Sequence, residues 1–246
     1  MTRKPLITAL ALGSATLASG TSLDFDPAQY SEKTATVNGE TITYRAYENI
    51  PYVANPVDAA HQTINIYIPV AYYNGGSING FTKDSAPIFF PNNVGGYMPG
   101  EAGQPETDSR GSGKPNAIAV ALSQGYVVAS PGARGRTEAN GRAPAAIVDL
   151  KAAVRYLKAN DAKMAGDARK IISNGTSAGG ALSALLGATG GSAHCSAPAA
   201  TPANTRPICA RWVRPTPRTT CSPCPPIARL PIWNTPMPPT NGSSTA

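Results

Sequence analysis

The stretch KIISNGTSAGGALSALLGATG, residues 170–190, joins a short apolar run to a run of small residues through a glycine-bounded serine. The apolar run predicts a buried strand over residues 170–174, and the small-residue run that follows predicts a helix. Between them stands the pattern G-x-S-x-G, formed by Gly175, Ser177 and Gly179. A serine on a sharp turn from strand to helix is typical of an enzyme nucleophile. We therefore predict that Ser177 is a nucleophile, and a plain glycine-serine turn is the alternative.

The same turn predicts where negative charge would be stabilised. A turn this tight leaves no room for side chains beside the serine, so its flanking positions must be glycine. The Ala178 amide would lie at the start of the helix, where the helix dipole favours negative charge. A second amide of such a site comes from a loop after an earlier strand. The loop in FFPNNVGGYMPG follows a predicted strand and contains Gly95 and Gly96, so we predict an oxyanion hole from Ala178 and this loop.

Strand and helix patterns alternate between residues 35 and 190. The strands are short and apolar along nearly their whole length, as strands buried on both faces are. Such alternation predicts an α/β fold with a mostly parallel sheet and helices on both faces. The predicted strands cover residues 40–45, 63–69, 86–91, 126–130 and 170–174, with helices over 116–125, 143–160 and after Ser177.

The helix predicted over residues 143–160 is amphipathic. Its apolar side chains recur at three and four residues, which places them on one face. That face comprises Ile147, Leu150, Val154 and Leu157, and the charged residues expected largely off it are Asp149, Lys151, Arg155 and Lys158. The helix should therefore cover the sheet with its charged side toward solvent.

The start of the chain has the pattern of an export leader. Arg3 and Lys4 precede a short apolar run over residues 6–17, and Ala18-Ser19-Gly20 offers small residues for cleavage. An ordinary first helix is the alternative, but the run lacks amphipathic periodicity. We predict a signal peptide over residues 1–20 and a secreted or periplasmic protein. No later run approaches the ~18–20 apolar residues of a membrane span, so none is expected.

Charge is distributed unevenly along the chain. The formal net charge is +7, yet all 14 acidic residues lie between Asp24 and Asp167, and residues 191–246 are basic and proline-rich. Because the basicity belongs to this tail, it does not indicate a nucleic-acid partner.

Cys221 and Cys224 form a C-x-x-C without a spaced second pair, so no metal is expected there. Arg134 and Arg136 in GARGR are predicted to be turn or ion-pair residues, with a substrate-facing role as the alternative.

Several segments together resemble a known family. YVANPVDAAHQTINIYIP, SINGFTKDSAPIFFPNNVGGYMPGE, VVASPGARGRT, RAPAAIVDLKAAVRYL and ISNGTSAGGALSALLGATG are similar to bacterial tannase-like esterases (subtype-B tannase, feruloyl-esterase-like), and the likeness runs from about Asp24 to Gly190. The resemblance implies the α/β-hydrolase fold and hydrolysis of phenolic-acid esters, typically galloyl esters. It further implies a Ser-Asp/Glu-His triad, a small-molecule phenolic ester as substrate, and neither metal nor cofactor. Ser177 would be the nucleophile, with oxyanion amides from Ala178 and the Gly95-Gly96 loop.

Two partners of that triad are missing from their expected places. In this fold the acid and then the histidine follow the serine, but no Asp or Glu follows Ser177, and the only later histidine is His194. His61 precedes the serine and is predicted to be a surface or strand-entry residue. We therefore expect little or no activity, and a strand over residues 170–174 left at the edge of the sheet. A feruloyl or general carboxylesterase and a non-catalytic binding module are the alternatives.

The composition of the tail suggests how the partners were lost. Read one base out of frame, the junction Trp233-Asn234 must encode glutamate, and other positions permit an acid-containing sequence. We predict a frameshift between about Gly190 and Asn204. The organisation expected is a signal peptide over residues 1–20, the N-terminal part of an α/β-hydrolase domain over 24–190 and an irregular, disordered, out-of-frame tail over 191–246.

Overall fold

The computed structural model describes residues 22–189 of the 246-residue chain. These residues fall within one compact unit, Met1–Asn204. The predicted signal peptide, the predicted out-of-frame tail, His194 and the C-x-x-C cysteines lie outside the described residues, so the statements made about them stay predictions.

The described residues alternate strands and helices largely as the patterns predict. Thr63–Pro69 matches its predicted strand, while β1 was not predicted and β2 extends well beyond the predicted residues 40–45. The elements are β1 (Ser31–Val37), β2 (Glu40–Pro51), β3 (Thr63–Pro69), η1 (Val70–Asn74), β4 (Pro87–Pro91), η2 (Ser109–Gly111), α1 (Ala117–Ser123), β5 (Val127–Pro131), α2 (Ala145–Ala159), η3 (Asp161–Lys163), β6 (Asp167–Asn174) and α3 (Ala178–Thr189).

The strands form one six-stranded sheet in the order β1-β2-β3-β5-β4-β6. Pairs β5-β4 and β4-β6 are parallel, whereas β1-β2, β2-β3 and β3-β5 are antiparallel. The described sheet is therefore mixed rather than mostly parallel, within the predicted α/β class. One physical reason lies between β1 and β2, where Asn38 and Gly39 adopt φ of 53° and 87°. Positive φ at both central residues makes the tight turn that joins antiparallel strands.

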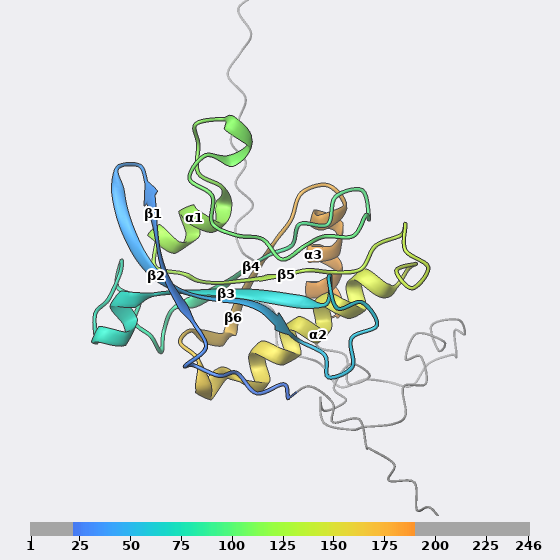
Figure 1. Ribbon diagram of the computed structural model, residues 1–246, viewed down its shortest axis with the longest axis horizontal. Coiled ribbons are helices and arrows are strands. Elements are labelled where there is room, and N and C mark those ends of the chain that lie inside the picture. The colour runs from blue at the N-terminus through green and yellow to red at the C-terminus, as the bar shows by residue number, and fades with distance from the viewer. Residues whose placement is uncertain (1–21, 190–246) are drawn as a thin grey trace, which may run out of the picture. The chain divides into compact units, whose positions relative to one another are not determined.

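Helices cover both faces of the sheet, as predicted (Figure 1). On one face, Ile118, Ala121 and Leu122 of α1 pack with Tyr67 and Val128 from the sheet. On the other face lies the larger core. It joins Leu150 and Leu157 of α2, Leu182 and Leu186 of α3, and the isoleucines Ile64, Ile66 and Ile68 of β3. Residues of β4 and β5 contribute to both cores.

Helix α2 departs from its predicted pattern at one residue. Leu150 and Leu157 are fully buried as expected, but Asp149, expected largely off the apolar face, is only 1% exposed. Its charge is compensated by Arg134, whose Nε and Nη2 donate to Asp149 at 2.9 and 2.8 Å. A buried carboxylate requires such a partner, and this one comes from the loop after β5. The ion-pair prediction for Arg134 is thereby confirmed, whereas Arg136 is exposed at a turn.

Strand β6 is the outermost strand of the described sheet next to β4. Its Ile172 side chain is 45% exposed, and Leu185 of α3 is 42% exposed. This agrees with the edge position predicted for residues 170–174. Between residues 22 and 189, no helix is both long and apolar enough to cross a membrane.

Candidate active site at the β6–α3 turn

Ser177 occupies the turn between β6 and α3 with a backbone conformation that serine rarely adopts. Its φ is 56°, in the left-handed region, and the residue is exposed. Helix α3 begins directly afterwards, because the Gly179 amide donates to the Thr176 carbonyl at 3.0 Å and the Ala181 amide donates to the Ser177 carbonyl at 3.1 Å. Positive φ at a non-glycine residue is costly and recurs at functional sites. The geometry is that of a serine presented on a strand-turn-helix bend.

The glycines on either side are required by close packing. A Cβ atom at Gly175 would lie 2.4 Å from the backbone of Gly179. A Cβ at Gly179 would lie 2.7 Å from Asn92 Oδ1 and 3.1 Å from the Val94 carbonyl oxygen. Real Cβ atoms essentially never show contacts of 2.4 or 2.7 Å, so a side chain at either position would force its neighbours to move. The two glycines were predicted from the tightness of the turn, and the packing accounts for both.

Asn92 holds this turn against the neighbouring strand. It directly follows β4, and its Nδ2 donates to the carbonyls of Asn174 and Gly179 at 3.1 and 3.2 Å and to Ser183 Oγ at 3.0 Å. The Oδ1 atom is buried without a hydrogen-bond partner among the described residues. The sequence analysis missed Asn92. The available signal was a polar residue placed directly after an apolar strand, at the edge where functional groups gather.

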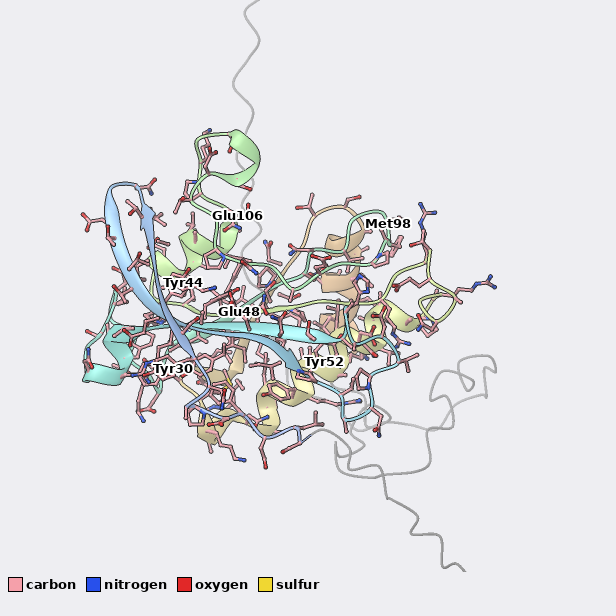
Figure 2. The ribbon with its side chains drawn as sticks, in the orientation of Figure 1. Tyr30, Tyr44, Glu48, Tyr52, Met98 and Glu106 are labelled. Atoms are coloured by element: carbon pink, nitrogen blue, oxygen red, sulfur yellow. The ribbon has the colours of Figure 1, made fainter. Side chains whose placement is uncertain are left out.

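The predicted oxyanion donors come from two segments that the fold brings together. The Ala178 amide donates to no acceptor among residues 22–189. The loop after β4 reaches α3, since Val94 lies against Gly179. Gly95 and Gly96 follow immediately and are exposed, and Met98 marks this loop at the end of the sheet where α3 begins (Figure 2).

The glycine loop is anchored on its far side as well. Gly100 and Ala133 exchange backbone hydrogen bonds of 2.9 and 2.8 Å, and the Arg136 amide donates to the Tyr97 carbonyl at 2.7 Å. Tyr97 itself has φ of 58°, next to Gly96 at 57°. Asn92 at one end and Gly100 at the other hold the loop that contains Gly95 and Gly96.

No general base meets Ser177 within residues 22–189. The imidazole of His61, which precedes β3, instead contacts two carboxylates: its Nδ1 lies 2.8 Å from Asp58 Oδ2 and 3.2 Å from Glu138 Oε1. Burial raises the pKa of Asp58, but hydrogen bonds from the His61 ring, Glu138 and the His61 amide outweigh it, so the pKa lies below its ordinary value. His61 is thus a strand-entry residue, as predicted, with partners of its own.

Comparisons with known proteins find similar sequences and similar folds. The profile of the BD-FAE family matches residues 95–206. The crystal structure of Fusobacterium nucleatum tannase is 59% identical with a TM-score of 0.68 over 71% of this chain and 37% of that one. A tannin acyl hydrolase in complex with ethyl gallate is 47% identical with a TM-score of 0.64 over 70% and 39%. The tannase from Lactobacillus plantarum is 46% identical with a TM-score of 0.62 over 68% and 37%. No curated protein matches.

The likeness covers most of this chain but less than half of each relative. The chain spans about 37% of the length of the Fusobacterium tannase. Identities of 46% to 59% and the BD-FAE match agree with the family resemblance found in the sequence and with the α/β-hydrolase architecture. By fold and by sequence, this chain matches the tannase- and feruloyl-esterase-like α/β-hydrolases over the part of their length that it covers.

Proposed function

We propose that Ser177 is the nucleophile of a serine esterase acting on phenolic esters of the galloyl type. The observation that carries this proposal is the left-handed φ of 56° at an exposed serine between β6 and α3. Neighbouring tannase structures hold ethyl gallate and 3,4-dihydroxybenzoate, which motivates the phenolic substrate class.

In the proposed reaction, Ser177 Oγ attacks the acyl carbon of the ester and forms a tetrahedral intermediate. The negative oxygen of that intermediate would accept hydrogen bonds from the Ala178 amide and an amide of the Gly95-Gly96 loop. Collapse expels the alcohol and leaves an acyl group on Oγ. Water then attacks this acyl-enzyme, releasing the phenolic acid and restoring the hydroxyl.

Both half-reactions move a proton, and the chain as given lacks the groups that usually do so. The serine proton must pass to a base and then to the leaving alcohol. Within residues 22–189 no histidine contacts Ser177, and the sequence has no Asp or Glu after it. Loss of the histidine alone costs about as much as loss of the whole triad, on the order of 10⁶ in turnover. We therefore propose that the 246-residue chain hydrolyses methyl gallate far more slowly than tannases that have all three triad residues.

A chimera tests the role of Ser177 separately from the missing base. Residues 1–189 of this chain are joined to the part of the Fusobacterium nucleatum tannase that the chain does not cover. We expect the chimera to hydrolyse methyl gallate, Ser177→Ala to abolish turnover, and Ser123→Ala on α1 to leave it unchanged. An active Ser177→Ala chimera would refute the proposal. Ordinary enzymatic rates in the 246-residue chain itself would refute only the loss of activity.

A feruloyl esterase is the second candidate, favoured by the BD-FAE match over residues 95–206. Comparing kcat/KM for methyl gallate and methyl ferulate in the chimera distinguishes the two acyl classes.

A non-catalytic binding module is the other alternative, and it predicts a different result. In that case a phosphonate probe fails to label Ser177 while a phenolic ligand still raises the melting temperature.

A further inference from the structure

Three metal-ligating side chains that are not part of the Ser177 turn meet in the fold. Asp58, His61 and Glu138 each offer one ligand atom, and these atoms lie within 4.8 Å of one another. Their side chains are 14%, 19% and 25% exposed. The group is therefore sheltered but open to an ion from solvent. Asp58 and His61 come from the segment before β3, which Tyr52 begins in Figure 2, and Glu138 comes from the loop after β5.

Each carboxylate is oriented by its second oxygen. Asp58 Oδ1 accepts from the amides of Ala60 and His61 at 3.0 and 3.2 Å, which leaves Oδ2 facing the imidazole. Glu138 Oε2 accepts from the Gly135 amide at 3.2 Å, which leaves Oε1 facing the same nitrogen. Outer contacts of this kind fix the direction of metal ligands.

The two segments that carry the ligands are also tied to each other independently of the cluster. Gln62 donates through Nε2 to Asp149 Oδ1 at 2.9 Å and accepts through Oε1 from the Asp58 amide at 3.0 Å. Asp149 in turn binds Arg134, next to the loop of Glu138. Contacts other than those with the His61 ring therefore also hold the segments that carry Asp58 and Glu138.

One hydrogen on the imidazole cannot make a good hydrogen bond to both carboxylates at once. A single hydrogen on His61 Nδ1 has two carboxylate oxygens within reach, and a hydrogen bond is strongest when it points at one acceptor. A divalent cation in place of that proton contacts all three ligands at once, with one nitrogen and two oxygens. Imidazole and carboxylate together suit Zn²⁺ and Mn²⁺, and water fills the remaining positions.

We propose that Asp58, His61 and Glu138 bind one divalent transition-metal cation that clamps the segment before β3 to the loop after β5. Binding displaces one proton from the imidazole when Nδ1 carries it. None of the three residues is a residue of the esterase proposal, which rests on Ser177, Ala178 and the Gly95-Gly96 loop.

Electron paramagnetic resonance of Mn²⁺ titrated into the 246-residue chain tests the site. Bound Mn²⁺ loses the six-line signal of the free ion, which gives affinity and stoichiometry directly. We expect one ion per chain, and Glu138→Gln and His61→Gln should each weaken binding at least about tenfold. Both variants keep polar side chains of similar size. The matched control is Glu106→Gln, an exposed glutamate outside the cluster that leaves the affinity unchanged.

The tail carries His194 and the four cysteines, which are metal ligands in other proteins. The Glu138→Gln variant distinguishes binding at the cluster from binding to the tail, because it leaves the tail intact. Mn²⁺ that stays free in the presence of the wild-type chain overturns the proposal. Binding of equal strength in the wild type, Glu138→Gln and His61→Gln overturns it as well.

Discussion

Asn92 Nδ2 donates a hydrogen bond of 3.2 Å to the carbonyl of Gly179, joining the end of β4 to the first turn of α3. The same nitrogen reaches the Asn174 carbonyl at 3.1 Å. One amide group thus binds the backbone on both sides of Ser177. The unusual φ of Ser177 persists because this contact and the packed glycines determine the turn from both sides.

Replacing Asn92 by aspartate should destabilise the fold more than replacing it by alanine. Alanine removes the hydrogen bonds from Asn92 Nδ2 to the carbonyls of Asn174 and Gly179, a loss of about 1–3 kcal/mol in the free energy of unfolding. Aspartate adds a carboxylate facing those carbonyls. Urea unfolding measures both, with Asn74→Asp at an exposed position as control. Equal stability of Asn92→Asp and wild type would contradict the role given to Asn92.

Two glycines of the same helix should respond in opposite directions to alanine. Gly179→Ala places a Cβ 2.7 Å from Asn92 Oδ1, and such overpacking costs about 1–3 kcal/mol. Gly187 of α3 has no atom within 4 Å of an added Cβ. Alanine there should stabilise by about 0.5–1 kcal/mol through helix propensity. Unfolding midpoints in urea measure the pair, and a Gly179→Ala chain as stable as Gly187→Ala argues against the packing described.

Asp149→Ala should be among the most damaging single changes in α2. It leaves the Arg134 guanidinium partly buried without its bidentate partner, and breaking a buried pair costs about 3–5 kcal/mol. The surface pair between Lys83 and Asp84 serves as control, since both side chains are mostly exposed. Asp84→Asn should leave the midpoint of urea unfolding unchanged. Similar curves for the two variants would show that the buried pair contributes little.

Asp167 makes stability depend on pH in the acid range. Hydrogen bonds from the Arg169 side chain hold the pKa of Asp167 well below its ordinary value, against the opposing effect of burial. A carboxyl with a lowered pKa in the folded state stabilises above its unfolded pKa of about 3.9 and loses that contribution as pH falls toward the folded value.

The Asp167→Asn variant should therefore be less stable than wild type at pH 7, and the gap should narrow below about pH 4. Urea unfolding at pH 7, 4 and 2.5 measures this difference. If the difference in stability stays constant across these three pH values, Asp167 does not cause the pH dependence of stability.

Local patterns predicted the elements that carry the site. The alternating isoleucines of Thr63–Pro69 and the strand-glycine-serine-helix order around Ser177 are properties of neighbouring residues, and both appear in the structure. Strand β1 was missed because only Ala35 and Val37 of its residues are buried. Its pairing with β2 depends on the turn at Asn38-Gly39, and the mixed strand order follows from pairings that no single segment encodes.

The parts of the site that escaped prediction all depend on distant contacts. Asp149 is buried because Arg134 reaches it from another loop, so helical periodicity alone places it wrongly. Asn92 contacts Gly179 across the boundary between β4 and α3. Asp58 and His61 are near in sequence, but Glu138 joins them only through the fold. The described contacts of these residues arise from strand order and loop packing, which the sequence does not display.

The proposed nucleophile is tested most directly by mass spectrometry of the chimera after reaction with a fluorophosphonate, a reagent that phosphonylates activated serines. We expect one phosphonyl group per chain on the peptide that contains Ser177, and none after Ser177→Ala. A label on any other serine, or equal labelling of Ser177→Ala, would contradict the assignment of Ser177 as the group that attacks the ester.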